Sequence, residues 1–141
     1  MVDDKIIKKL LELKKKKKNE PQDAITLFNL YERIIEEDEV IQEELDDMDE
    51  ITVQDIYSDD DFKYWVKLGK GNFQVGEGEI DEPDITMSAN TETWSGLGSG
   101  EIDSTSAYMS GDLSVEGNLQ DAMAYGEILD MIRFFLEDLE E

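Results

Sequence analysis

The feature that most constrains the fold lies in the middle of the chain, where apolar residues occupy every second position. In the stretch FKYWVKLG (62–69), apolar side chains alternate with a second set that contains two lysines. A period of two is that of a β-strand with one buried face. The turn GKG (69–71) follows, and then the stretch NFQVGEG (72–78). The pattern predicts a β-hairpin that belongs to a sheet with one apolar side.

Three further stretches complete the predicted sheet. They are ITVQDIY (51–57), DITMSA (84–89) and DLSVEGN (112–118), and the last places Leu113 and Val115 on one face. Turn residues separate the first four stretches, which predicts a meander of antiparallel strands. The fifth stretch is bounded by glycines and lies directly before a long helical pattern.

Apolar residues follow the i, i+3, i+4 spacing of helices on both sides of the strands. A basic amphipathic pattern covers 2–18, a second helix covers 23–45, and a long apolar helix covers 119–139. Two short helices are expected between the fourth and fifth strands. Asn90 or Thr91 is placed to cap the first of them, and Asp103 the second.

Composition and missing motifs argue against an enzyme. The chain contains no cysteine and no histidine, which removes the thiolate nucleophile, the commonest general base and the commonest metal ligand. The acidic clusters at 46–50 and 58–61 lack the spacing of a calcium loop, and the glycine clusters match neither a dinucleotide fingerprint nor a P-loop. We therefore predict no catalytic residues, no metal site and no cofactor. An enzyme based on Asp or Glu is the remaining catalytic alternative, and no sequence feature favours it.

Charge divides the chain into two parts. Residues 1–18 hold eight lysines and three acidic residues, a net charge of +5, whereas 19–141 hold five basic and 34 acidic residues, a net charge of −29. We predict a lysine-rich N-terminal arm over 1–18 and one domain over 19–141. The acidic body argues against nucleic acid as a partner. The arm is either a solvated tail or an anchor for anionic lipid, in which the membrane contacts are Lys14, Lys15, Lys16, Lys17 and Lys18.

The length and apolar content fit one folded domain. The chain has 141 residues, of which 39% are hydrophobic, enough for a core. No apolar run reaches the roughly 20 residues of a membrane span, and no secretory signal follows the first lysines. The sequence therefore predicts a cytoplasmic protein.

From Phe62 onward, four motifs occur together and in order. They are the hairpin WVKLGKGNFQVGEG, the strand PDITMSA, the helix TETWSGLGSGEID and the segment SAYMSGDLSVEGNLQDAM. In this order they resemble the sterol carrier protein type-two family, also called nonspecific lipid-transfer proteins. The resemblance covers about the last eighty residues. It implies an α/β fold of the α+β type, with a five-stranded, mainly antiparallel sheet covered on one face by helices.

The resemblance also implies a function and a site. Family members hold lipid in an apolar tunnel between sheet and helices. We therefore expect the chain to bind and carry a hydrophobic lipid, such as a fatty acyl chain, an isoprenoid, a phospholipid or a sterol, and to deliver it to membranes through its basic segment. The alternative is a non-catalytic accessory or dimerisation module with the same fold. The residues expected to line the tunnel are Trp94, Leu97, Tyr108, Met109, Leu113, Val115, Met123, Ile128 and Ile132.

Overall fold

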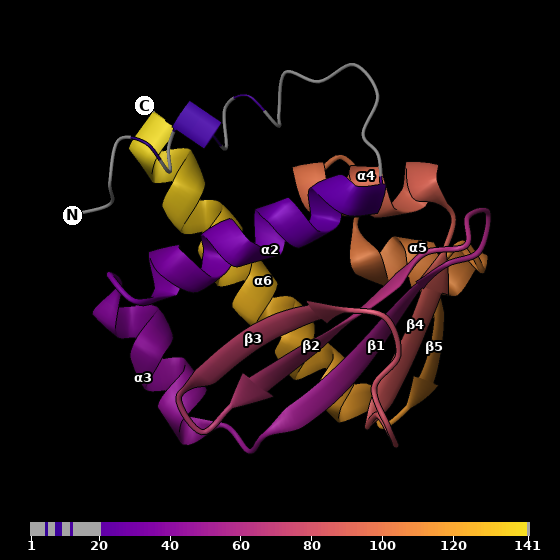
Figure 1. Ribbon diagram of the computed structural model, residues 1–141, viewed down its shortest axis with the longest axis horizontal. Helices are drawn as coiled ribbons and strands as arrows, with labels where there is room; N and C mark the ends of the chain where they lie inside the picture. The colour runs from indigo at the N-terminus through magenta and orange to yellow at the C-terminus, as the bar shows by residue number, and fades with distance from the viewer. Residues whose placement is uncertain (1–4, 6–7, 10–11, 13–20, 141) are drawn as a thin grey trace.

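The computed structural model describes residues 5, 8–9, 12 and 21–140, and this part forms a β-sheet with helices packed on one face (Figure 1). The strands of this part are β1 (Ile51–Tyr57), β2 (Lys63–Gly69), β3 (Asn72–Glu77), β4 (Ile85–Ala89) and β5 (Ser114–Gly117). They lie in the spatial order β3-β2-β1-β4-β5. The predicted fold class and all five predicted strands are confirmed.

Three of the four strand pairs are antiparallel, so the expectation of a mainly antiparallel sheet is also confirmed. β1 pairs with β2, β2 with β3, and β4 with β5 in antiparallel fashion, whereas β1 and β4 are parallel. The expected four-strand meander is wrong at its last step. After β3 the chain crosses the sheet and places β4 on the other side of β1. Alternation along one strand does not reveal this, because the period is two in either pairing direction.

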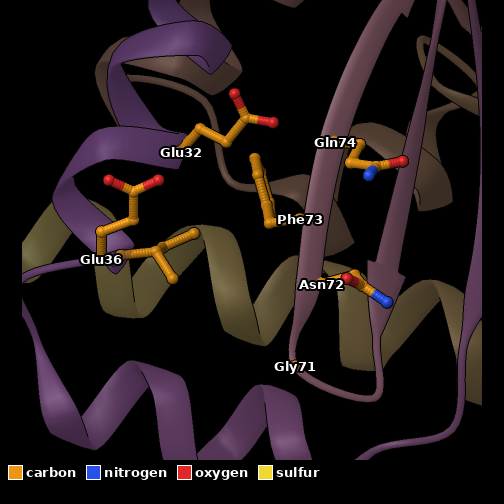
Figure 2. Close-up of a pocket in the computed structure, with 7 residues that line it drawn as sticks. Glu32, Glu36, Gly71, Asn72, Phe73 and Gln74 are labelled. Atoms are coloured by element: carbon orange, nitrogen blue, oxygen red, sulfur yellow. The ribbon is translucent and has the colours of Figure 1, made fainter.

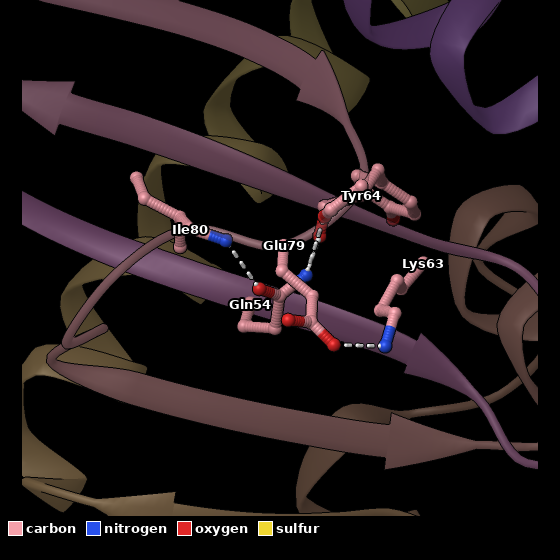
Figure 3. A network of polar contacts seen from close by, with 6 residues as sticks. Gln54, Lys63, Tyr64, Glu79 and Ile80 are labelled. Atoms are coloured by element: carbon pink, nitrogen blue, oxygen red, sulfur yellow. Dashed lines mark hydrogen bonds and ion pairs between the residues drawn. The ribbon is translucent and has the colours of Figure 1, made fainter.

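A buried glutamine holds the crossing segment, residues 78–84, against the outer face of the sheet (Figure 3). The side-chain nitrogen of Gln54 donates to the carbonyl oxygens of Tyr64 and Gly78, both at 2.9 Å. Its side-chain oxygen accepts a hydrogen bond from the Ile80 amide at 2.8 Å. Gln54 is buried, and these three bonds replace the water that its amide group loses on folding.

The helices of the described part are α2 (Pro21–Ile35), α3 (Glu39–Asp47), α4 (Thr91–Ser99), α5 (Ser104–Ser110) and α6 (Leu119–Glu140). The single helix expected over 23–45 is divided in two, and this expectation is wrong. Asp38 causes the division. Its backbone is extended, and its carboxylate accepts hydrogen bonds from the Val40 and Ile41 amides. Asp favours such an N-cap because it satisfies amides that have no partner inside the helix.

Both short helices between β4 and β5 begin where the sequence predicts. The side chain of Asn90 accepts from the Thr93 amide at 2.8 Å, and that of Asp103 accepts from the Ser106 amide at 3.0 Å. The second helix, α5, ends at Gly111, whose φ of 88° is readily adopted by glycine. These caps fix the direction in which the chain enters β5.

The face of the sheet that packs against the helices is called the inner face below, and it forms the core. From α2, the ring of Phe28 lies 5.4 Å from the ring of Tyr64 and 6.2 Å from that of Phe73. Helix α6 runs diagonally across the same face (Figure 1). The buried strand residues of the inner face are Ile51, Val53, Asp55, Tyr57, Tyr64, Val66, Leu68, Phe73, Ile85, Met87 and Ala89.

Most of the predicted arm lies outside the described residues, and this includes all five lysines at 14–18. Among the residues that are described, no helix combines the length and the apolar character needed to cross a membrane.

Candidate functional site

The candidate site is the layer between the inner face and the helices, where the lipid tunnel is expected. Six of the nine predicted lining residues belong to the core of this layer. The structure brings them together in one apolar cluster. Leu113, Ile128 and Ile132 are buried, and Trp94, Leu97 and Val115 are partly buried and pack against the core.

The other three predicted lining residues lie at the surface. The exposed fractions are 44% for Tyr108, 80% for Met109 and 65% for Met123. Tyr108 and Met109 belong to the end of α5, and Met123 belongs to the second turn of α6. Leu119, in the first turn of α6, is exposed to 49%. The structure therefore leaves these apolar side chains in contact with water.

A row of aromatic rings lines the interior from α4 to β3. The ring of Trp94 lies 5.9 Å from that of Tyr57, which lies 6.4 Å from the ring of Tyr64. Phe28 and Phe73 continue the row. Trp94 is held in place because its indole nitrogen donates to a backbone carbonyl of β1 at 2.9 Å. Such rings offer a large apolar surface of fixed shape.

A carboxylic acid lies in the middle of this apolar layer. Asp55 belongs to the central strand, points to the inner face and is fully buried. Its neighbours in register are Tyr64 of β2 and Met87 of β4. From α6, the Tyr125 hydroxyl donates to Asp55 Oδ2 at 2.9 Å. The second oxygen, Oδ1, has no hydrogen-bond partner in the part of the chain that is described.

Burial dominates the electrostatics of this group. Burial raises the pKa of Asp55 from 3.8 to about 7, while the hydrogen bond from Tyr125 and, to a smaller extent, the neighbouring Tyr64 side chain lower it. Burial and then the negative charge of Asp55 raise the pKa of both tyrosine hydroxyls well above 10.0. Both phenols therefore stay neutral hydrogen-bond donors at physiological pH. Asp55 changes its charge near neutrality.

Asp55 is not among the residues predicted for the site, although the sequence contains a signal for it. The strand at 51–57 buries Ile51, Val53 and Tyr57, and the same alternation places Asp55 beside them. An unpaired polar group in a core costs about 1–3 kcal/mol, and more when it is charged. A costly acid at a core position is a mark of a functional site.

A shallow pocket of about 220 Å³ lies outside this layer, between α2 and β3 (Figure 2). Glu32 of α2 and Glu36, which directly follows that helix, stand on one side of it, Asn72 and Gln74 of β3 on the other, and Phe73 between them. Partial burial, and then the negative charge of Glu36, raise the pKa of Glu32. The pocket is smaller than the roughly 300–1,000 Å³ of typical ligand sites, and its rim is polar. We do not assign the lipid site to it.

Acidic side chains are frequent on the surface, but within the described ranges no three of them form a group that could hold a metal ion. Several pair with lysines instead. Lys67 lies 3.6 Å from Glu50, and Lys70 lies 3.5 Å from Asp49. These pairs are well exposed and contribute little to stability.

A five-stranded sheet with helices over one apolar face defines a small α/β domain built around an apolar interlayer. The SCP-2 sterol transfer family matches residues 28–130, and the chain belongs to this family. The family in general binds and transfers lipids, and its domains are generally non-catalytic. A comparison with curated proteins finds no match.

Solved structures share the fold. The chain is similar to the UbiJ-SCP2 ubiquinone synthesis protein, with a TM-score of 0.64 at 13% identity, over 84% of this chain and 98% of the other. It is also similar to the apo form of sterol carrier protein 2 from Yarrowia lipolytica, with a TM-score of 0.59 at 19% identity. This similarity covers 73% of this chain and 86% of the Yarrowia protein. In the sec-alkylsulfatase Pisa1 from Pseudomonas sp., the similarity has a TM-score of 0.50 at 17% identity. It covers 57% of this chain but only 12% of the sulfatase.

Proposed function

We propose that residues 19–141 bind one lipid molecule between the inner face of the sheet and helix α6, and carry it through the cytoplasm. Membership of the SCP-2 sterol transfer family supports this proposal. The aromatic row and the buried side chains of Leu113, Ile128 and Ile132 supply the apolar surroundings that a lipid chain needs. Each CH₂ group removed from water contributes about 0.8 kcal/mol, so a long chain binds without any catalytic group.

Uptake in this proposal requires α6 to move away from the sheet. Core side chains fill the interlayer: Ile128 is exposed to 3% and Ile132 to 0%. A lipid chain takes over their contacts with the inner face when the helix swings out. The burial of the lipid offsets the contacts that α6 loses.

The direct test is to identify what the purified protein carries. Native mass spectrometry measures the mass of bound lipid, and extraction into organic solvent followed by lipid mass spectrometry identifies it. Ile128→Trp places a bulkier side chain where the lipid chain would lie and is expected to lower the fraction of lipid-bound protein several-fold. Val40→Trp is the matched control, because Val40 is exposed on α3. Equal lipid loads in both folded variants contradict the proposed site.

We further propose that the lysines at 14–18 guide the domain to anionic membranes. The contrast between the net charge of +5 over 1–18 and that of −29 over 19–141 supports this role. Each lysine near an anionic surface contributes about 1 kcal/mol. Replacing all five with glutamine is expected to reduce sedimentation with phosphatidylserine vesicles at least tenfold, and to leave the weak binding to phosphatidylcholine vesicles unchanged. Unaltered binding to phosphatidylserine refutes the role.

The second candidate function is a non-catalytic accessory or dimerisation module. The exposed apolar side chains of Tyr108, Met109, Leu119 and Met123 favour it. In that case the purified protein carries no lipid, and Met109→Glu combined with Met123→Glu converts an oligomer into a monomer in analytical ultracentrifugation. A lipid-loaded monomer supports the carrier instead.

A further inference from the structure

The unpaired oxygen of Asp55 is the starting point for a more specific ligand. A structural role for this residue, that of fixing α6 to β1, is fulfilled by Oδ2 and the Tyr125 hydroxyl at 2.9 Å. That role gives no reason for the second oxygen, Oδ1, to remain buried without a partner. Gln54 shows the contrast, because both polar atoms of its buried amide are hydrogen-bonded.

The position of Asp55 places this oxygen where a lipid must pass. The residue lies on the central strand, with two strands on each side, and its side chain faces the interlayer. Tyr64 and Met87 flank it across the sheet, and Tyr125 covers it from α6. A lipid that separates α6 from the sheet reaches Oδ1 as a polar point within apolar walls.

The charges around Asp55 decide which head group fits. The neighbours that influence its pKa, or whose pKa it influences, are Tyr57, Tyr64 and Tyr125. All are neutral phenols, so no cation among these described neighbours attracts a carboxylate or a phosphate. Ionised Asp55 repels such groups. A hydroxyl group fits both states of the acid, because it donates to a carboxylate and accepts from a carboxylic acid.

We propose that Asp55, together with Tyr64 and Tyr125, binds the hydroxyl group of an uncharged lipid, such as a long-chain alcohol, and disfavours lipids with an anionic head. This specificity rests on the proposed lipid-carrier function. Asp55 supplies the hydrogen bond that distinguishes an alcohol from a plain hydrocarbon. Its negative charge distinguishes an alcohol from a fatty acid.

The test compares ligands with one chain and different heads. Nile red reports on the apolar interior of the full chain at pH 8, and dodecanol, dodecanoate and dodecane are added to displace it. We expect wild-type protein to bind dodecanol at least tenfold more tightly than dodecanoate. In Asp55→Leu the affinity for dodecanol falls about tenfold, the affinity for dodecane is unchanged, and that for dodecanoate rises. Glu116→Gln, which removes an exposed carboxylate of β5, retains the wild-type order.

Two further variants separate the hydrogen bond from the charge. Asp55→Asn keeps a hydrogen-bonding side chain without the charge. It is therefore expected to keep the wild-type affinity for dodecanol and to bind dodecanoate more tightly than the wild type does. Tyr125→Phe removes only the hydroxyl that orients Asp55 and is expected to lower the affinity for dodecanol several-fold. These variants decide the question if Asp55→Leu does not fold, as monitored by circular dichroism.

The outcomes distinguish this proposal from the carrier function itself. If none of the three ligands displaces Nile red from wild-type protein, the carrier function fails. If all three displace it, and the ratio of dodecanol to dodecanoate affinity is the same in wild-type protein and the folded Asp55 variants, the carrier function stands and the hydroxyl specificity is overturned.

Discussion

The buried carboxyl group of Asp55 makes the stability of the domain depend on pH in a way that one substitution removes. Its pKa is about 7 in the folded state and 3.8 when ordinarily solvated. The folded protein therefore holds this proton more tightly than the unfolded chain. The stabilisation is fully present below about pH 4 and is lost as the pH rises through 7. At about 1.4 kcal/mol per pH unit, the loss totals about 4 kcal/mol.

The assay compares wild-type protein with Asp55→Asn, which has a side chain of the same shape but no titration. Urea unfolding is followed by tryptophan fluorescence between pH 5 and pH 8. This range avoids the isoelectric point of about 4.1, where the protein has little net charge and associates. More than half of the expected 4 kcal/mol falls within this range. The free energy of unfolding of the wild type should therefore fall by about 2–3 kcal/mol relative to the variant.

The difference between the two proteins isolates Asp55 from other titrations. The many surface carboxylates repel one another in both proteins, so their effect cancels. The phenols that face Asp55 from the sheet and from α6 have raised pKa values and stay neutral over this range. Two pH profiles that run parallel from pH 5 to pH 8 would refute the assignment of a raised pKa to Asp55.

Four further substitutions test the packing, the crossing segment and a helix cap, each by urea unfolding. Gly126→Ala in α6 is expected to stabilise the protein by about 0.5–1 kcal/mol, because an added Cβ meets nothing within 4 Å. Gly76→Ala should destabilise it by about 1–3 kcal/mol, because an added Cβ would overlap the Trp65 ring. Equal effects of the two substitutions contradict this reasoning. Gln54→Ala removes three hydrogen bonds, two of them to the crossing segment, and should cost at least about 2 kcal/mol. A smaller cost means that water replaces them. Asp38→Ala removes the N-cap of α3 and should lower the free energy of unfolding by about 1 kcal/mol. A decrease smaller than about 0.3 kcal/mol would contradict this role of Asp38.

The local features of the fold could be predicted because they depend on neighbouring residues. Alternation at 62–69 and capping at Asn90 and Asp103 act within a few positions, and the structure confirms both. The parallel pairing of β1 with β4 could not be predicted in this way. It depends on the path of residues 78–84 across the sheet, which the side chain of Gln54 holds and no periodicity reports.

In the candidate site, too, the features set by neighbouring residues could be predicted, and those set by the tertiary structure could not. Core positions such as Leu113 and Ile132 follow from apolar spacing, and the structure buries both. Met109 was expected in the tunnel, but the end of α5 turns its side chain to the solvent, and such a rotation depends on how helices dock. Asp55 could have been found, because it shares a strand face with Val53. Its hydrogen bond to Tyr125 spans seventy positions and needs the three-dimensional structure.

The crossing segment determines the order in which the sheet is completed. β1, β2 and β3 meet through short turns, so their pairing closes small loops and is fast. β4 reaches β1 only after 78–84 has crossed, and α6 follows both β4 and β5 along the chain. We expect Asp55 to remain hydrated and ionised until α6 docks and brings Tyr125 to it. Because the pKa of Asp55 in the folded protein is about 7, assembly below that pH ends with the uptake of a proton from solution by Asp55. The last helix therefore docks more readily as the solution becomes more acidic.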